Sequence, residues 1–260
     1  ISTGKFDDKF GIPIGRAREV YAEAARLPGL AITGIDMHIG SQITDMKPFD
    51  DAASLMAELA RDLLADGHRL HHLDFGGGLG IPYREDNEPP PDPLAYAHVI
   101  KARAGHLGLK MIFEMGRMIA GNAGVLVTEV VYVKRGETKT FAIVDAAMND
   151  LIRPTLYDAH HDIKPLNAAP PDAEWQVVDV VGPVCESGDY LAKGRDLPAL
   201  KPGDRLALMT AGAYGAVASS TYNTRRLIPE VLVDGERYAV VRPRPSYDEL
   251  IGLDRLPEWF

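Results

Sequence analysis

Apolar residues in the first 121 positions alternate between helical spacing and short continuous runs. The helical spacing predicts three helices, over 16–27, 48–66 and 93–106. The short apolar runs predict three strands, over 30–38, 70–75 and 109–114. Strands and helices in strict alternation are typical of parallel β-α units, so this half predicts part of a (β/α) barrel.

The pattern changes after Gly121. Apolar and β-branched runs then follow one another without helical stripes, over 125–134, 140–144, 175–184 and 205–210. Residues 231–241 hold an Asp-Gly turn between two apolar runs, which predicts a β-hairpin. We therefore expect an α/β plus β fold of two domains, a partial barrel over 1–121 and a mostly antiparallel β domain over 122–260.

Three consecutive glycines follow the second predicted strand, in the sequence LDFGGGLGIPY at 73–83. Consecutive glycines cost backbone entropy. Successive backbone N–H groups that no Cβ shields form a concavity that can hold an anion. Gly76, Gly77 and Gly78 therefore predict a phosphate site. The alternative is a tight turn with a purely structural role. A loop and not a helix comes next, which argues against a dinucleotide-binding fingerprint.

Polar residues also lie at the C-terminal ends of the other two predicted strands, with His38 and Ser41 at the first and Glu114 and Arg117 at the third. In a (β/α) barrel these strand ends form the active-site face. Taken singly, Glu114 and Arg117 predict a structural ion pair, and His38 an ordinary histidine. Together with a phosphate site, they suit pyridoxal phosphate, whose ring nitrogen calls for a carboxylate.

In the β half, Cys185 is the only cysteine, so an internal disulfide is excluded, as in proteins of a reducing cytoplasm. A single cysteine is more often buried filler. Its neighbours Glu186 and Asp189 favour a functional loop instead. Residues 145–157 are dense in polar groups after a strand, and Tyr214 lies in the permissive turn AGAYG.

Composition and charge exclude some classes of partner. The 260 residues are 46% hydrophobic and 25% charged, as in an ordinary soluble globular protein. The net charge of −9 argues against nonspecific binding to nucleic acid or to acidic membranes. No apolar run reaches the roughly 18 residues of a membrane span. We expect a cytoplasmic protein without membrane or nucleic-acid partners.

Six motifs in this order resemble the diaminopimelate decarboxylases: HIGSQ, DFGGGLGIPY, E-x-GR, NDLIRPTLYDAHH, VGPVCESGDYLA and GAYGA. The resemblance covers essentially the whole chain. It implies an alanine-racemase-like barrel with a β domain, pyridoxal 5'-phosphate as cofactor and no metal. It also implies decarboxylation of meso-2,6-diaminopimelate to L-lysine, the last step of lysine biosynthesis, in a homodimer with composite active sites.

The resemblance also implies a role for each site residue. His38 stacks on the cofactor ring, Glu114 faces its pyridine nitrogen, and Cys185 donates a proton in a neighbouring subunit's site. Cofactor binding is completed by Ser41, Gly76, Gly77, Gly78, Gly116, Arg117 and Tyr214. Substrate binding falls to Arg117, Arg153, Tyr157, Glu186 and Tyr214. The residue chemistry agrees, because a second α-amino acid head needs a cation for its carboxylate and an anion for its ammonium group.

Two departures from the family pattern bear on activity. Met115 stands where the family has proline, which could loosen the turn that presents Glu114. The family's cofactor-linked lysine follows the first barrel strand, and Lys5, Lys9 and Lys110 do not occupy that place. We therefore expect a C-terminal fragment that is inactive by itself.

Two alternatives stay open beside this interpretation. An ornithine- or arginine-type decarboxylase of the same fold is the nearer one, and the pair Arg153 and Glu186 argues against it. The other is a non-catalytic protein that binds pyridoxal phosphate. The presence of Cys185, Glu186 and Tyr214 argues against this alternative, because a carrier needs neither a proton donor nor a substrate clamp.

Overall fold

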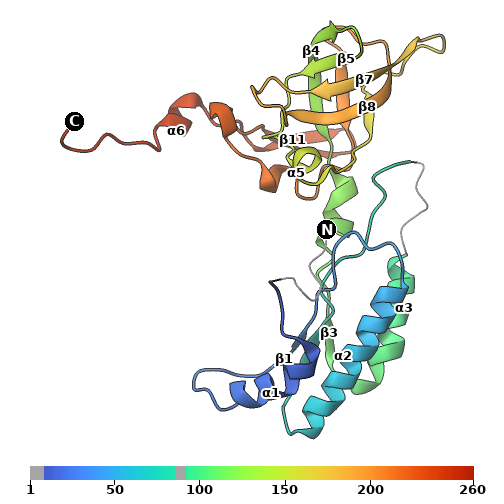
Figure 1. Ribbon diagram of the computed structural model, residues 1–260, viewed down its shortest axis with the longest axis vertical. Coiled ribbons are helices and arrows are strands. Elements are labelled where there is room, and N and C mark those ends of the chain that lie inside the picture. The colour runs from blue at the N-terminus through green and yellow to red at the C-terminus, as the bar shows by residue number, and fades with distance from the viewer. Residues whose placement is uncertain (1–8, 86–91) are drawn as a thin grey trace. The chain divides into compact units, whose positions relative to one another are not determined.

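The computed structural model describes residues 9–85 and 92–260, and the chain forms two compact units, Ile1–Asn122 and Ala123–Phe260. The prediction for Lys5 lies outside the described residues. The two units are coloured blue to green and green to red in Figure 1. No helix in the described ranges is both long enough and apolar enough to cross a membrane.

The first unit is built on a parallel sheet in the order β1-β2-β3. Its strands are β1 (Gly34–Asp36), β2 (His72–Asp74) and β3 (Lys110–Ile112), and the register aligns Ile35, Leu73 and Met111 across the sheet. The predicted parallel β-α order is confirmed. The strands are shorter than predicted. Flanking residues still make single backbone hydrogen bonds to the neighbouring strand, such as Met37 N–H to the Asp74 carbonyl, but do not continue the regular ladder.

Three longer helices alternate with these strands, close to their predicted positions: α1 (Ile14–Ala24), α2 (Lys47–Ala65) and α3 (Pro93–Ala104), which a 3-10 turn (Gly105–Leu107) extends. Asp92 caps α3 by accepting the N–H of Leu94 at 3.0 Å, and Pro93 fits the first turn, where no N–H is needed. The short helix α4 (Gly116–Ala120) and a 3-10 turn (Gly121–Ala123) follow β3.

The core of the first unit lies between the sheet and the apolar stripe of α2. Phe49 and Leu63 of this stripe are almost completely buried with Leu73 and Ile100. The rings of Phe49 and Tyr96 meet edge to face at 4.9 Å, which joins α2 to α3. Figure 1 shows these two helices side by side. The packed helices fix the sheet and therefore the positions of the loops at its strand ends.

The second unit is a six-stranded sheet in the order β6-β9-β4-β5-β7-β8. The expectation of a mostly antiparallel sheet is confirmed, because β5 and β7 are the one parallel pair among the described strands of this sheet. Its strands are β4 (Leu126–Arg135), β5 (Thr140–Val144), β6 (Ile163–Pro165), β7 (Trp175–Val181), β8 (Tyr190–Pro198) and β9 (Arg205–Leu208). The helix α5 (Arg153–Tyr157) lies between β5 and β6, and two 3-10 turns (Ala216–Ala218 and Tyr222–Thr224) follow β9.

Two of these strands, β6 and β8, were not predicted. β8 holds four charged or glycine residues, Lys193 to Asp196, and its register against β7 shifts twice, so no period-two pattern is visible in its sequence. Its apolar residues Leu191 and Leu197 are nevertheless buried.

The predicted hairpin is confirmed as β10 (Glu230–Asp234) and β11 (Arg237–Arg242), and a helix α6 (Tyr247–Ile251) follows it. The hairpin forms a sheet of its own. Its apolar side chains are exposed on both faces, with Val233 and Tyr238 paired on one face and Leu232 on the other.

Candidate active site

The glycine triplet lies where the three strand ends of the first unit converge. A Cβ added to any of the three glycines would stand 2.4 Å from a carbonyl oxygen of a neighbouring segment, namely those of Met37, Glu114 and Gly40. Gly76 and Gly78 also have φ of +61° and +97°, values that side chains rarely tolerate. The close approach of three backbones therefore requires glycine here, in addition to any ligand.

Two N–H groups of the triplet bind residues of the same unit. Gly76 donates to the carboxylate of Asp74 at 2.9 Å, and Gly77 donates to Nδ1 of His38 at 3.3 Å. The N–H of Gly78 meets no acceptor among the described residues. Gly78 is therefore the glycine of the triplet that keeps a donor for an anion.

Arg117 places a cation beside this loop. It lies in α4 and is only 6% exposed. Its Nη2 donates to Ser41 Oγ at 2.9 Å, and its Nη1 donates to the hydroxyl of Tyr83. Ser41 follows β1, so the guanidinium joins the segments after β1, β2 and β3. By contrast, the N–H of Gly116 donates to the Glu114 carbonyl at 2.8 Å and closes the turn instead of facing a ligand.

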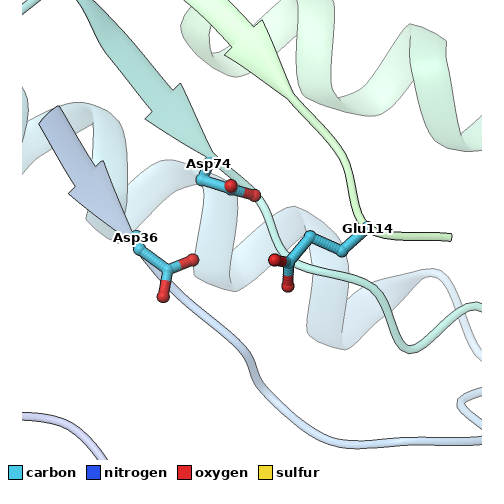
Figure 2. A group of neighbouring side chains, drawn as sticks. All are labelled: Asp36, Asp74 and Glu114. Carbon is cyan, nitrogen blue, oxygen red and sulfur yellow. The ribbon is translucent and has the colours of Figure 1, made fainter. Parts of the chain in front are cut away.

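Three carboxylates meet at the same strand ends. The carboxylate oxygens of Asp36, Asp74 and Glu114 lie within 4.8 Å of one another, and Figure 2 shows the three side chains turned toward a common point. Desolvation, and then the charge of Asp74, raises the pKa of Asp36. Because three carboxylates repel one another at this distance, the cluster favours a cation among them.

The sequence interpretation missed Asp36 and Asp74. A signal was present, because both are the last residue of their strands and face each other in the parallel register. The predicted strands extend further along the chain than the observed ones, so Asp36 and Asp74 were placed inside strands and not at their ends. The shorter strands bring these two aspartates to the end of the sheet.

In the second unit, one hydrogen bond joins α5 to the loop that holds Cys185 and Glu186. Thr155 Oγ1 donates to the carbonyl of Gly188 at 2.6 Å. The buried carboxylate of Asp189 organises the loop by accepting the N–H groups of Met148 and Val184, each at 2.7 Å. The structure therefore brings together the two segments from which a substrate clamp was predicted.

The predicted substrate residues of this unit differ in exposure. Cys185 and Glu186 are exposed, and the N–H of Gly188 helps to lower the pKa of Glu186, which keeps it anionic. Tyr157 and Tyr214 are 51% and 52% exposed. Tyr214 adopts a φ of +58°, which is uncommon for a non-glycine residue and is often found at functional sites.

Arg153 differs from these residues because it is buried, with 5% of its surface exposed. Its Nη1 lies 2.7 Å from Nε2 of His161, which is fully buried. Burial lowers the pKa of His161 to about 4, so the ring is neutral near pH 7. His161 was not predicted. Asp158, with a φ of +50°, reverses the chain after α5 and brings His161 back to Arg153. Such a reversal leaves no helical or strand periodicity in the sequence, so the contact could not be predicted from it.

The lysine positions agree with the sequence interpretation. Lys110 begins β3, at the opposite end of the strand from Glu114. Lys9 is exposed in a bend before α1. Lys110 therefore does not lie at the strand ends where the carboxylates and Arg117 converge.

This chain is similar to a family of known proteins. The family model "Pyridoxal-dependent decarboxylase, C-terminal sheet domain" matches residues 20–212. The chain belongs to this family. It is 52% identical to the diaminopimelate decarboxylase of Vibrio cholerae over 99% of its length, and 46% identical to that of Zymomonas mobilis over 100%.

A solved structure shares the fold. The diaminopimelate decarboxylase of Helicobacter pylori complexed with L-lysine superimposes with a TM-score of 0.90 and 39% identity, covering 97% of this chain and 62% of that one. The chain spans 61% of the length of the two curated relatives. The α/β plus β fold class and the resemblance to this family are therefore confirmed.

The residues of the first unit fit the cofactor of this family. Pyridoxal phosphate has an anionic phosphate at one end and a ring nitrogen that can carry a proton at the other. Arg117, Ser41 and the N–H of Gly78 supply a cation and hydrogen-bond donors for the phosphate, and the three carboxylates supply negative charge for the protonated ring nitrogen. This set of side chains suits both charged groups of the cofactor.

Met115 is accommodated where the family has proline. Its φ of −75° is one that proline adopts, and its N–H donates no hydrogen bond within the described residues. It also packs against the core of the first unit. The turn that presents Glu114 is held by the Glu114 N–H, which donates to the Gly76 carbonyl at 2.8 Å.

We expect Met115→Pro to change the free energy of unfolding by less than about 1 kcal/mol, because the restriction of the unfolded chain, which stabilises by about 0.4–1 kcal/mol, is offset by the lost packing of the Met115 side chain. Urea unfolding measures the difference. Ile119→Pro in α4 is the matched control and should destabilise, because proline there removes the hydrogen bond from the Ile119 N–H to the Met115 carbonyl, 3.1 Å long. A clear loss of stability in Met115→Pro would show that this turn does not tolerate the ring.

Proposed function

We propose that a protein of the relatives' full length containing these residues, which we call the full-length protein, decarboxylates meso-2,6-diaminopimelate to L-lysine with pyridoxal phosphate. The family match and the names of the similar proteins support this activity. The solved relative complexed with L-lysine supports the product. We further propose that the protein is cytoplasmic and that residues 1–121 and 122–260 are its barrel part and its β domain.

The observation that carries the proposal is that a buried guanidinium and a cluster of three carboxylates both belong to the segments at the strand ends of the first unit. Arg117 and Ser41, with Gly78, would hold the phosphate, and Glu114 would hold the proton on the ring nitrogen, with Asp36 and Asp74 adding negative potential. His38 would cover the ring face. When bound, the cofactor accepts the electron pair that the departing carboxylate leaves behind.

The substrate clamp would come from the second unit. Arg153 supplies a fixed cation for the distal carboxylate, and Glu186 supplies an anion for the distal ammonium group. Tyr157 lies four residues after Arg153 and therefore on the same face of α5, where its hydroxyl can add a hydrogen bond. Arg117 would also contact the substrate, and Tyr214 both substrate and cofactor.

Cys185 would return a proton to the carbon that has lost carbon dioxide, in the active site of a second copy of the protein. Its exposed position in a loop that Asp189 fixes supports this role. The same position would make the active site composite and the dimer obligatory.

A substrate without the distal carboxylate should be a poor one. L-Ornithine would leave the buried guanidinium of Arg153 without its anion, which costs about 2–5 kcal/mol. We therefore expect kcat/KM of the full-length protein for L-ornithine to be at least thirtyfold below that for meso-diaminopimelate, as a decarboxylation assay with both compounds measures. Comparable values would favour an ornithine-type decarboxylase, and no turnover of either would favour a non-catalytic cofactor-binding protein.

Composite sites predict complementation between inactive variants. Cys185→Ala and Glu114→Ala damage different parts of the site, so a hybrid dimer keeps one intact site of two. Random exchange of equal amounts should restore about a quarter of the wild-type activity, since half of the dimers are hybrids. Exchange is verified with two differently tagged chains. Absence of recovery in verified hybrids would place Cys185 in its own subunit's site.

A further inference from the structure

The contact between Arg153 and His161 is polar and deeply buried. Arg153 Nη1 and His161 Nε2 are 2.7 Å apart, with 5% and 0% of the two residues exposed. A buried guanidinium needs hydrogen-bond acceptors, because a buried donor without an acceptor carries an uncompensated desolvation penalty. His161 therefore does more than fill space beside α5.

The second ring nitrogen fixes which tautomer His161 adopts. Nδ1 lies 2.9 Å from the carbonyl oxygen of Met209, and a carbonyl can only accept. Nδ1 must therefore carry the proton. Nε2 is then an acceptor for the Nη1–H of Arg153, which is always a donor. The hydrogen bonds therefore run in one direction only. The His161 ring accepts from the Arg153 guanidinium and donates to the Met209 carbonyl.

The surrounding charges favour the same neutral ring. Arg153 and Arg195 are cations near His161, and His160 is a further ring beside it. His160 is itself directed to Asp162, with Nε2 and Oδ1 2.6 Å apart. A protonated His161 would present an N–H to the Arg153 N–H, so the contact needs the neutral form.

We propose that His161 is a positioning residue that holds the guanidinium of Arg153 in the orientation that receives the distal carboxylate of the substrate. The inference rests on the proposed function, because the carboxylate belongs to the proposed substrate. The His161 ring is itself held by the carbonyl of Met209, the residue after β9, and the N–H of Met209 donates to the Asp162 carbonyl at 2.8 Å. A preorganised guanidinium loses less entropy when it binds the carboxylate.

The rival explanation is that His161 only supports the packing of α5 against the sheet. Two substitutions of closely similar size separate the two explanations. His161→Gln keeps an acceptor near the former Nε2, and His161→Met fills a similar volume without one. Loss of packing affects both variants alike, whereas loss of the acceptor affects only the methionine variant.

The test uses the full-length protein and two ligands that differ in one group. L-Lysine keeps the carboxylate that Arg153 receives, and cadaverine is the same molecule without it. We expect His161→Met to weaken L-lysine binding and to raise KM for meso-diaminopimelate at least tenfold, with kcat within threefold. Cadaverine affinity should change less than twofold. His161→Gln should lie within threefold of wild type throughout.

A control and a spectroscopic measurement complete the design. His160→Gln removes the neighbouring ring, which faces Asp162, and should leave L-lysine affinity within twofold. Nitrogen-15 NMR of the histidine rings should show His161 of the wild-type protein with its proton on Nδ1 at pH 7. This measurement needs no variant, so it tests the hydrogen bond between Arg153 and His161 even where His161→Met does not fold.

Three results would each overturn the proposal. The first is equal effects of His161→Gln and His161→Met, the second is an equal loss of cadaverine and L-lysine binding, and the third is a proton on Nε2 of His161. The failure of the proposed function looks different, because the wild-type protein would then not turn over meso-diaminopimelate. L-Lysine binding and the tautomer would still report on His161 in that case.

Discussion

The candidate active site depends on the approach of three backbones at the glycine triplet. A side chain on Gly76, Gly77 or Gly78 would meet a carbonyl oxygen at 2.4 Å, so the segments after β1 and β3 can close on the segment after β2 only because these residues are glycines. This closure brings Glu114 beside Asp74. The core between α2 and the sheet holds the strands in register and so supplies the rigidity that the approach requires.

In the second unit, buried polar groups fix the conformations of the loops. Asp189 binds two N–H groups of the loops beside it, and Asp150 accepts the Ala147 N–H at 2.9 Å while it pairs with Arg225 at 3.3 Å. Such groups remain buried only when their hydrogen bonds are satisfied, so each one fixes a loop in one conformation. Exposed residues such as Glu186 can then act from a rigid frame.

The sequence was sufficient to predict the alternation of the first unit, the hairpin and the strand-end location of His38, Ser41 and Glu114, because these follow from periodicity and from parallel topology. It was insufficient where a residue's role depends on a partner distant in sequence. The need for glycine at 76–78 lies partly in neighbouring carbonyls, and the partner of Arg153 is reached only after a chain reversal at Asp158. β8 lacked a pattern because its register shifts.

We propose that Glu114 at the strand-end site pairs with a proton on the cofactor's ring nitrogen. This pairing is tested most directly by the affinity of the full-length protein for pyridoxal 5'-phosphate and for its 1-deaza analogue, which has carbon in place of that nitrogen. We predict that the wild-type protein prefers the natural cofactor at least tenfold and that Glu114→Gln removes most of this preference. An undiminished preference for the natural cofactor in Glu114→Gln would show that Glu114 does not pair with the ring nitrogen.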